Sequence, residues 1–270
     1  MLLTVDVGNS QTVLATFDGA RRVASWRVTT APRATADELQ FVWRGLLRDV
    51  AITGVAACST VPALLPSLRA LLGSLEVPVV LIGPGVRTGA PLHVDNPREV
   101  GADRVVTALA AHELFGRRPD GRGRPVVVVD FGTSTNVDAV GPDGQFLGGA
   151  LAPGVEVSLD ALASRAAQLR SVELSCPPHA IGKNTVAALQ SGLVLGFAGL
   201  VDGLVGRIAA ELVAQFDAAP VVVATGGLSP VIADSCRSIA EREPDLTVIG
   251  LRLAFERQQA AERGPAARRP

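Results

Sequence analysis

The chain has 270 residues, 48% of them apolar, and a formal net charge of -1 at pH 7. It can therefore bury one large core or two smaller ones, and its balanced charge argues against nucleic acid or an anionic membrane as a partner. Three scattered cysteines and three scattered histidines, with no CxxC, argue against a disulfide framework and a structural zinc site. A reducing, cytoplasmic compartment is expected.

The hydropathy of the sequence predicts no membrane segment. The first ten residues lack the basic region of a signal peptide, and the longest uncharged stretch, residues 185–201, contains Gln190 and several glycines. A membrane span needs about 20 predominantly apolar residues. The stretch is therefore interpreted as a buried helix of a soluble protein.

The first half of the chain predicts three consecutive strands and then alternating helices and strands. Apolar, β-branched runs predict the strands, and apolar side chains at helical spacing predict the helices. The strands are expected at residues 2–7, 12–17, 23–29, 54–58 and 79–82, and the helices at 35–48, 62–72 and 102–115. Residues 116–125, rich in glycine, proline and arginine, predict a loop or linker.

The second half begins with the same pattern. Strands are expected at residues 126–129, 135–140, 145–151, 221–224 and 246–249, and helices at 155–169, 184–215, 230–239 and 251–262. The sequence therefore predicts two domains, residues 1–118 and 119–263, followed by a disordered tail at 264–270.

Two segments, each after an apolar strand, share the same residues at the same spacing. They are Asp6-x-Gly8-x-Ser10-x-x-Val13 and Asp130-x-Gly132-x-Ser134-x-x-Val137. A single Asp-x-Gly is common after any strand, because tight turns favour these residues. Two copies in the same context favour an internal duplication.

Each of these turns has the composition of a phosphate-binding device. The glycine lets the backbone approach a ligand, and backbone N–H groups with the short side chains of Asn9, Ser10 and Thr133 can donate to phosphate oxygens. The aspartate can hold a hydrated cation. Neither a P-loop nor a GxGxxG after a strand occurs, so a phosphotransferase built on these turns would use neither a P-loop nor a protein-kinase scheme.

Three other positions have both a structural and a functional interpretation. Asp103 opens a helix, where a carboxylate is favoured in any case, or it is a general base beside a substrate-binding Arg104. Gly226, with Gly227 after it, either makes an ordinary turn or borders a flat adenine. Thr185 follows an asparagine that can cap a helix, and it can also bind a ligand.

Taken together, these residues resemble the type III pantothenate kinases over residues 2–257. The motifs, each weak alone but specific in this order and spacing, are Asp6-Val-Gly-Asn-Ser10, Asp95-Asn-Pro97, Gly101-Ala-Asp-Arg104, Asp130-Phe-Gly-Thr133, Gly148-Gly-Ala-Leu-Ala-Pro-Gly154, Ile181-Gly-Lys-Asn-Thr185 and Ala224-Thr-Gly-Gly227. The resemblance implies an α/β fold of duplicated ribonuclease-H-like halves, as in the hexokinase and actin superfamily, with mixed sheets flanked by helices. It also implies a homodimer whose pantothenate pocket includes residues of the partner.

The implied reaction is the ATP-dependent phosphorylation of pantothenate to 4′-phosphopantothenate, the first step of coenzyme A biosynthesis. The resemblance implies that ATP is bound by Asp6, Val7, Gly8, Asn9, Ser10, Gln11, Thr12, Val13, Thr133, Gly226 and Gly227. It implies Mg²⁺ near Asp6 and a monovalent cation, K⁺ or NH₄⁺, at Asp130. Pantothenate is expected at Val94, Gly101, Ala102, Asp103, Arg104 and Thr185, with Asp103 as the proton acceptor.

Two departures from the family are visible. Val94 stands where the family usually has a tyrosine, which predicts weaker pantothenate binding, and Asn136 replaces a common threonine, with little change expected. Two rival functions stay open: an accessory regulator of transcription, and a kinase or phosphatase of the same superfamily acting on a sugar, acetate or polyphosphate. Retention of Asp6 and Asp103 favours catalysis, and the segments 101–104 and 181–185 favour pantothenate.

Overall fold

The computed structural model describes residues 1–83, 85–165 and 172–263. The chain forms two compact units. The first unit contains residues 1–90, 95–110 and the chain from Leu246 on, and the second contains residues 91–94 and 111–245. The division differs from the expected boundary at 118/119 in three respects: the units divide after Ala110, residues 91–94 belong to the second unit, and the last helix belongs to the first.

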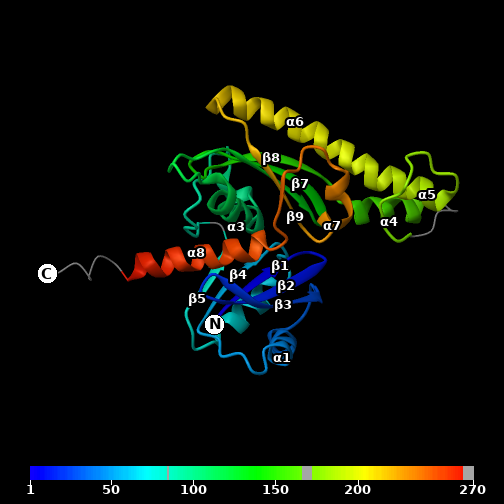
Figure 1. Cartoon of the computed structure of the whole chain (residues 1–270). Coiled ribbons are helices and arrows are strands. Elements are labelled where there is room, and N and C mark those ends of the chain that lie inside the picture. The colour runs from blue at the N-terminus through cyan, green and yellow to red at the C-terminus, as the bar shows by residue number, and fades with distance from the viewer. Residues whose placement is uncertain (84, 166–171, 264–270) are drawn as a thin grey trace. The chain divides into compact units, whose positions relative to one another are not determined.

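The first unit is built on a five-stranded mixed sheet in the order β3-β2-β1-β4-β5. Strands β1 and β2 pair antiparallel, as do β2 and β3, whereas β4 runs parallel to β1 and β5 parallel to β4. The strands are β1 (Leu2–Val7), β2 (Gln11–Asp18), β3 (Arg21–Thr29), β4 (Gly54–Ser59) and β5 (Val79–Ile82). All five strands predicted for this half are present (Figure 1).

Helices cover both faces of this sheet. On one face Leu3, Val5 and Val7 belong to a buried cluster with side chains of α1 (Ala36–Leu46) and α2 (Leu65–Gly73). On the other face Ala56 and Cys58 pack with side chains of α3 (Ala102–Ala111) and α8 (Leu246–Glu262). Alternate residues of each strand thus face different helix layers, and Asp6 shares a face with Cys58 because the two are register partners.

The second unit repeats this topology. Its sheet has the order β10-β9-β6-β7-β8, with β6 and β7 forming the hairpin and β9 parallel to β6. The strands are β6 (Val126–Phe131), β7 (Ser134–Val140), β8 (Phe146–Pro153), β9 (Val221–Thr225) and β10 (Glu241–Arg242). When the strands are numbered in chain order within each unit, both sheets have the order 3-2-1-4-5. The structure therefore supports the duplication inferred from the repeated motif.

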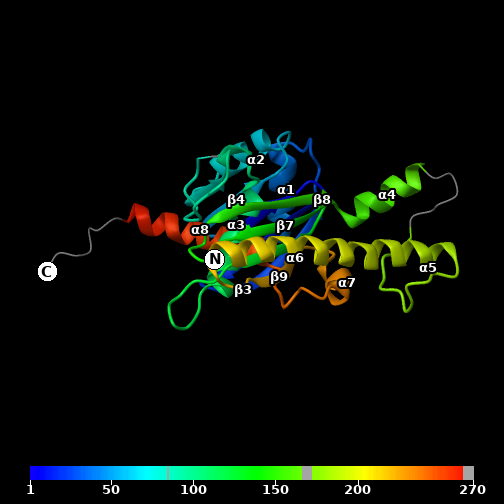
Figure 2. The same cartoon turned by 90° about the horizontal axis from the view of Figure 1, so that it is seen from above.

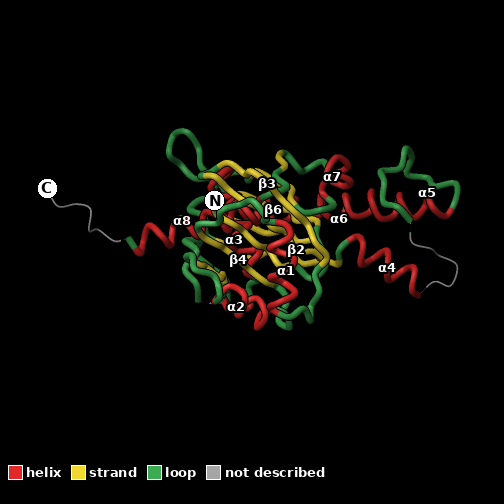
Figure 3. Tube along the Cα trace, turned by 90° about the horizontal axis from the view of Figure 1, so that it is seen from below, coloured by secondary structure: helices red, strands yellow, loops and turns green. Residues whose placement is uncertain are grey.

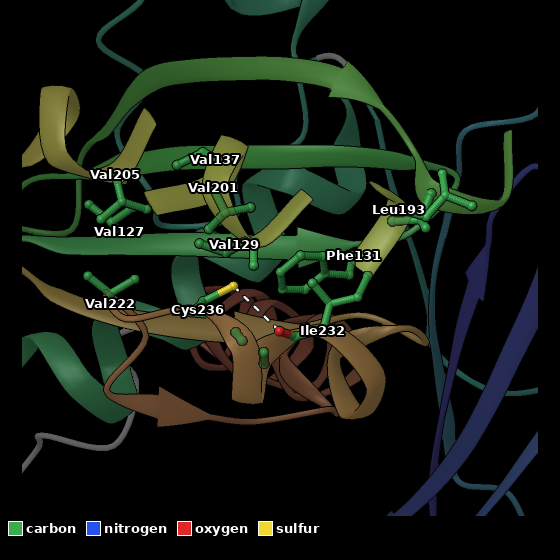
Figure 4. Close-up of a cluster of buried hydrophobic side chains, with 14 of the residues drawn as sticks. Val127, Val129, Phe131, Val137, Leu193, Val201, Val205, Val222, Ile232 and Cys236 are labelled. Atoms are coloured by element: carbon green, nitrogen blue, oxygen red, sulfur yellow. Dashed lines mark hydrogen bonds between the residues drawn. The ribbon is translucent and has the colours of Figure 1, made fainter. Parts of the chain in front are cut away.

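The core of the second unit lies between its sheet and helix α6 (Gly196–Phe216). Figure 4 shows Val127 and Val129 of β6 directed toward Val201 and Val205 of α6, with Phe131 closing the end of the cluster. The thiol of Cys236 bonds to the Ile232 carbonyl beneath the sheet. These apolar contacts anchor α6 along the strand that carries Asp130.

Part of the helical layer extends past the sheet of the second unit. Helices α4 (Val155–Arg165) and α5 (Thr185–Gln190) project beyond the strand ends in both Figure 2 and Figure 3, and α5 continues through a π-turn at Ser191–Leu195 into α6. The expected buried helix is therefore buried only in part. The continuous helix Thr185–Phe216 has the length and apolarity of a membrane span, and 28% of its most apolar window is buried.

Two predictions near the C-terminus were wrong. Residues 246–249 form the start of α8, not a strand, and the fifth strand of the second sheet is β10. The short apolar run at 246–249 has no clear period, but Leu246, Leu251 and Ala254 are buried at helical spacing against the first unit. The helix expected at 230–239 is limited to α7 (Ser229–Ile232) and a 3-10 turn at Ala233–Ser235.

Other boundaries differ by smaller amounts. The helix expected at 102–115 changes into a π-turn at His112–Gly116, and a 3-10 turn at Pro97–Glu99 precedes it. The last four residues of the helix expected at 155–169, and the tail at 264–270, lie outside the described residues.

Candidate functional site

One row of side chains crosses the first sheet at the carboxyl end of β1. Asp6 lies opposite Val13 on β2 and opposite Cys58 on β4, and Val13 lies opposite Arg27 on β3. Register partners point to the same face of a sheet, so Arg27, Asp6 and Cys58 project together. This face is the one that α3 covers.

The carboxylate of Asp6 is held in an environment that favours its protonated form. The Cys58 thiol donates a hydrogen bond to Asp6 Oδ1 at 3.3 Å. Burial raises the pKa of Asp6 to about 7, and the nearby charge of Asp103 adds to this, whereas Cys58 and Arg27 oppose it. Burial also raises the pKa of the Cys58 thiol, so Cys58 remains protonated and acts as a donor.

The carboxylate of Asp103 lies in the first turn of α3. Its Oδ1 is buried and has no hydrogen-bond partner among the described residues. Burial raises the pKa of Asp103, although bonds from the Arg104 backbone and from its own backbone oppose the shift. Gly101 leaves the room that this carboxylate occupies, because a Cβ there would lie 2.4 Å from Asp103 Oδ1. A desolvated carboxylate with a vacant acceptor is suited to take a proton from a hydroxyl.

The turn between β1 and β2 follows directly after the strand that carries Asp6. The N–H of Gly8 donates to the Gln11 carbonyl at 3.0 Å, and Asn9, Ser10 and Gln11 are exposed. Thr30, the residue after β3, bonds to the turn through both its hydroxyl and its backbone N–H. Neither Thr30 nor Cys58 was expected at the site from the sequence. A polar residue at a strand end gives no signal that would have identified Thr30.

The second unit holds a related arrangement at the carboxyl end of β6. Asp130 lies opposite Asn136 on β7 and opposite Thr225 on β9. Gly226, the next residue, has φ +92°, and a Cβ on it would lie 2.4 Å from Asp130 Oδ1 and 2.6 Å from the Phe131 amide nitrogen. Only glycine fits this position, because it needs both a positive φ and close backbone contact.

The other residues of the second hairpin follow the same strand ends. Asn136 is buried and accepts a hydrogen bond from Ser134 Oγ at 2.8 Å, so the replacement of the family's threonine is accommodated. Thr133 and Gly227 are exposed at the turns after β6 and β9. Asp130, Thr133 and Gly226 therefore lie at one edge of the second sheet.

The residues expected to bind pantothenate are not all in one unit. Gly101, Ala102, Asp103 and Arg104 open α3 in the first unit, whereas Val94 and Thr185 belong to the second. Thr185 is exposed at the start of α5, whose N-cap is Asn184 with its Oδ1 accepting from the Ala187 N–H at 2.8 Å. Val94 faces Gly148 within the second unit, and its effect on substrate affinity stays a prediction.

The acidic side chains set limits on how a metal can be held. No group of three or more His, Cys, Asp or Glu side chains with the arrangement of a metal site occurs among the described residues. Mg²⁺ commonly binds through one or two carboxylates together with substrate phosphates and water. The single carboxylate of Asp6, at a turn with exposed polar residues, fits that mode of binding and not a closed protein cage.

The fold resembles those of a solved transcriptional activator and a solved sugar kinase. A Baf-family transcriptional activator from Campylobacter jejuni superposes with a TM-score of 0.60 at 17% identity, covering 96% of this chain and 99% of that one. The inorganic polyphosphate/ATP-glucomannokinase of Arthrobacter sp. strain KM gives a TM-score of 0.51 at 16% identity, with 96% and 98% coverage. At these identities the likeness concerns the fold alone, and it confirms duplicated ribonuclease-H-like halves.

Sequence relatives are much closer. A family model described as type III pantothenate kinase matches residues 2–207. The type III pantothenate kinase of Frankia casuarinae is 54% identical over 259 residues, covering 95% of this chain and 99% of the relative. That of Saccharopolyspora erythraea is 55% identical over 268 residues, with 95% and 98% coverage. The family model and these near full-length identities show that the chain belongs to the type III pantothenate kinase family.

Proposed function

We propose that this chain transfers the γ-phosphoryl group of ATP to the primary hydroxyl of pantothenate, giving 4′-phosphopantothenate for coenzyme A synthesis. Membership of the family supports this reaction. The observation that carries it is Asp103, whose buried Oδ1 has no partner among the described residues while burial raises its pKa. A hydroxyl proton is the partner that such an oxygen lacks.

The residues divide the work of the reaction. Asp103 accepts the hydroxyl proton as the oxygen attacks, and a raised pKa makes it a better base near neutral pH. Backbone N–H groups of the turn after Asp6 donate to the phosphates, and Arg104, at the start of α3, is proposed to bind the pantothenate carboxylate. Thr133 and the glycines Gly226 and Gly227 are proposed to contact ATP from the second hairpin.

Two cations are proposed. Asp6 would hold Mg²⁺ together with the nucleotide phosphates, and the ion would supply positive charge to offset that of the transferring group. A monovalent cation, K⁺ or NH₄⁺, is proposed at Asp130. The Asp130 carboxylate and the Phe131 carbonyl both lie close to Gly226, which supports oxygen ligation at that point.

The test of this function is ADP release by the purified protein with ATP, Mg²⁺ and K⁺, with and without pantothenate. ADP release that depends on pantothenate, and that falls when Na⁺ replaces K⁺, is the expected result. A matched panel of glucose, acetate and polyphosphate addresses the other reactions of the superfamily. Phosphorylation of any of these in place of pantothenate would overturn the proposal.

We also propose that the enzyme is a cytoplasmic homodimer whose interface includes α5 and α6. Gly192, Gly196, Gly199 and Gly203 repeat at helical spacing along this helix, and a Cβ on any of them would meet open space. The apolar side chains of Ile181, just before α5, and Val186, within it, are also exposed. Light scattering coupled to gel filtration tests this, with a monomeric mass as the contrary result.

A further inference from the structure

Thr30 makes three hydrogen bonds to the turn that follows Asp6. Its hydroxyl donates to the Gly8 carbonyl at 2.7 Å, and its backbone N–H donates to the Ser10 carbonyl at 3.0 Å. The Thr12 hydroxyl lies 2.9 Å from the Thr30 hydroxyl. The single hydroxyl proton of Thr30 goes to a carbonyl, which can only accept, so Thr12 is the donor in this pair.

These bonds fix the direction of the backbone N–H groups in the turn. In a trans peptide the C=O and N–H bonds point in opposite directions. The Gly8 carbonyl points toward Thr30, so the N–H of Asn9 in the same peptide points away from it. The same holds for the Ser10 carbonyl and the N–H of Gln11. Holding the two carbonyls therefore aims two donors at the opposite side of the turn.

The two hydroxyls of Thr12 and Thr30, called the brace below, are buried, although the turn that they hold is exposed. Thr30 is 7% exposed and Thr12 is 6% exposed, whereas Asn9 and Ser10 are exposed. Buried hydroxyls with all partners in place keep one geometry, which is what a preorganised anion site requires. A rigid turn loses less entropy when it binds phosphate.

The same sheet topology forms without this brace. In the second unit Gly154 occupies the place of Thr30, and its N–H donates to the Thr133 carbonyl at 3.1 Å. Gly154 has no hydroxyl, and Thr135 Oγ1 is buried there without a partner among the described residues. A hairpin of this kind therefore does not need the hydroxyl pair in order to fold.

We propose that Thr30 is a positioning residue for nucleotide phosphate, acting through Gly8, Ser10 and Thr12. This inference rests on the proposed kinase function and assigns Thr30 to the phosphates of ATP, as distinct from adenosine and pantothenate. Thr30 itself touches neither substrate in this scheme. Its hydroxyl sets the orientation of the donors that do.

The experiment compares Thr30→Val, Thr30→Ser and Thr16→Val in the full-length protein. Thr16→Val is a matched control, because Thr16 is buried on β2 and its hydroxyl has no partner among the described residues. Steady-state kinetics give KM for ATP and for pantothenate, and calorimetry gives the affinities for MgADP and for adenosine.

Thr30→Val is expected to raise KM for ATP and weaken MgADP binding about ten-fold, the effect of one well-placed hydrogen bond. KM for pantothenate and adenosine affinity should stay within two-fold. Thr30→Ser keeps the hydroxyl and should restore ATP binding, and Thr16→Val should match the wild type.

Two results would overturn the role of Thr30. One is an unchanged KM for ATP in Thr30→Val. The other is an equal loss of MgADP, adenosine and pantothenate binding with a lowered melting temperature, which means general structural damage. If the wild type shows no pantothenate-dependent ADP release, the proposed function fails by itself, and the calorimetric comparison of MgADP with adenosine still tests Thr30.

Discussion

The two hairpins of the molecule carry one motif on turns of different length. Asp6 lies opposite Val13 across the first hairpin, whereas Asp130 lies opposite Asn136 across the second. The Gly8 N–H reaches the carbonyl three residues on, and the Gly132 N–H reaches the carbonyl only two residues on. The first turn therefore contains one residue more.

This extra residue shifts the correspondence that the sequence repeat predicts. Counted back from the second strand of each hairpin, Ser10 corresponds to Thr133, and Val13 corresponds to Asn136. The match of Ser10 with Ser134 and of Val13 with Val137 was wrong. Equal spacing in the sequence concealed an insertion, because two small polar residues follow the glycine in both copies, although Ser134 already belongs to β7.

The two turns are also held by different means. Side-chain hydroxyls of Thr12 and Thr30 hold the first turn. Close backbone packing holds the second, where a Cβ on Gly154 would lie 2.2 Å from the Thr133 carbonyl oxygen. The difference teaches that a duplicated motif can keep its aspartate and glycine while its supporting residues diverge. Substitutions at matched positions should therefore have unequal effects.

The largest effect is expected at Asp103 of the first unit. Asp103→Asn removes the proposed proton acceptor and should lower kcat about 10²–10⁴-fold while leaving MgADP affinity near that of the wild type. Asp37→Asn is the matched control, because Asp37 and Asp103 both lie in the first turn of a helix, but Asp37 is exposed whereas Asp103 Oδ1 is buried. Steady-state kinetics and calorimetry make the comparison.

A near-native kcat in Asp103→Asn would remove Asp103 from the chemistry. A loss of kcat in Asp37→Asn of similar size would mean that helix ends, and not the acid, control activity.

The next contrast is between Gly226 and its counterpart in the first unit. Thr225 pairs with Asp130 as Cys58 pairs with Asp6, so Ser59 corresponds to Gly226. Gly226→Ala should cost about 2–3 kcal/mol of unfolding free energy, because alanine disfavours a positive φ and its Cβ meets backbone atoms of Phe131. Ser59→Ala loses the hydrogen bond that Ser59 Oγ accepts from the Val61 N–H and the longer one that it donates to the Val61 carbonyl, and it should cost about 1 kcal/mol.

Urea denaturation measures both losses. Equal losses for the two variants would show that the second hairpin relaxes around Gly226 and that its glycine is not required by space.

The strands of both hairpins could be predicted from the sequence, because their apolar and β-branched runs end at unmistakable turn residues. The supporting residues could not. Thr30 is an ordinary polar residue after a strand, and its role depends on where β3 places it beside Gly8. Helix α8 was missed at its start because the interaction that decides it is tertiary. Gly250 lets α8 approach the Val106 carbonyl, since a Cβ there would lie 1.9 Å from that oxygen.

Asp6 is expected to make a smaller contribution to the free energy of unfolding, and this contribution depends on pH. Its pKa of about 7 exceeds the ordinary value of 3.8, so the folded chain binds this proton more tightly than the unfolded chain. The resulting stabilisation is complete below pH 4 and is lost as the pH rises through 7. Asp6→Asn cannot ionise, so its stability relative to the wild type should improve by about 1–3 kcal/mol between pH 5 and pH 8.

Urea denaturation at the two pH values, in EDTA and without nucleotide, measures this change. A stability difference between Asp6→Asn and wild type that is the same at pH 5 and pH 8 would contradict the raised pKa of Asp6.

The smallest difference in stability is expected between variants that lack the Thr12 hydroxyl and variants that lack the Thr135 hydroxyl. Thr12 and Thr135 correspond, but among the described residues only the Thr12 hydroxyl has a partner, in Thr30. Thr12→Val loses that bond and should destabilise the fold by about 1 kcal/mol, whereas Thr135→Val replaces a buried, unpartnered hydroxyl with a methyl group of similar size. Thr135→Val should therefore be neutral or stabilising by up to about 1 kcal/mol. Urea denaturation at pH 7 distinguishes the opposite signs. If Thr135→Val is as destabilised as Thr12→Val, bound water satisfies the Thr135 hydroxyl, and hydroxyl groups stabilise both turns.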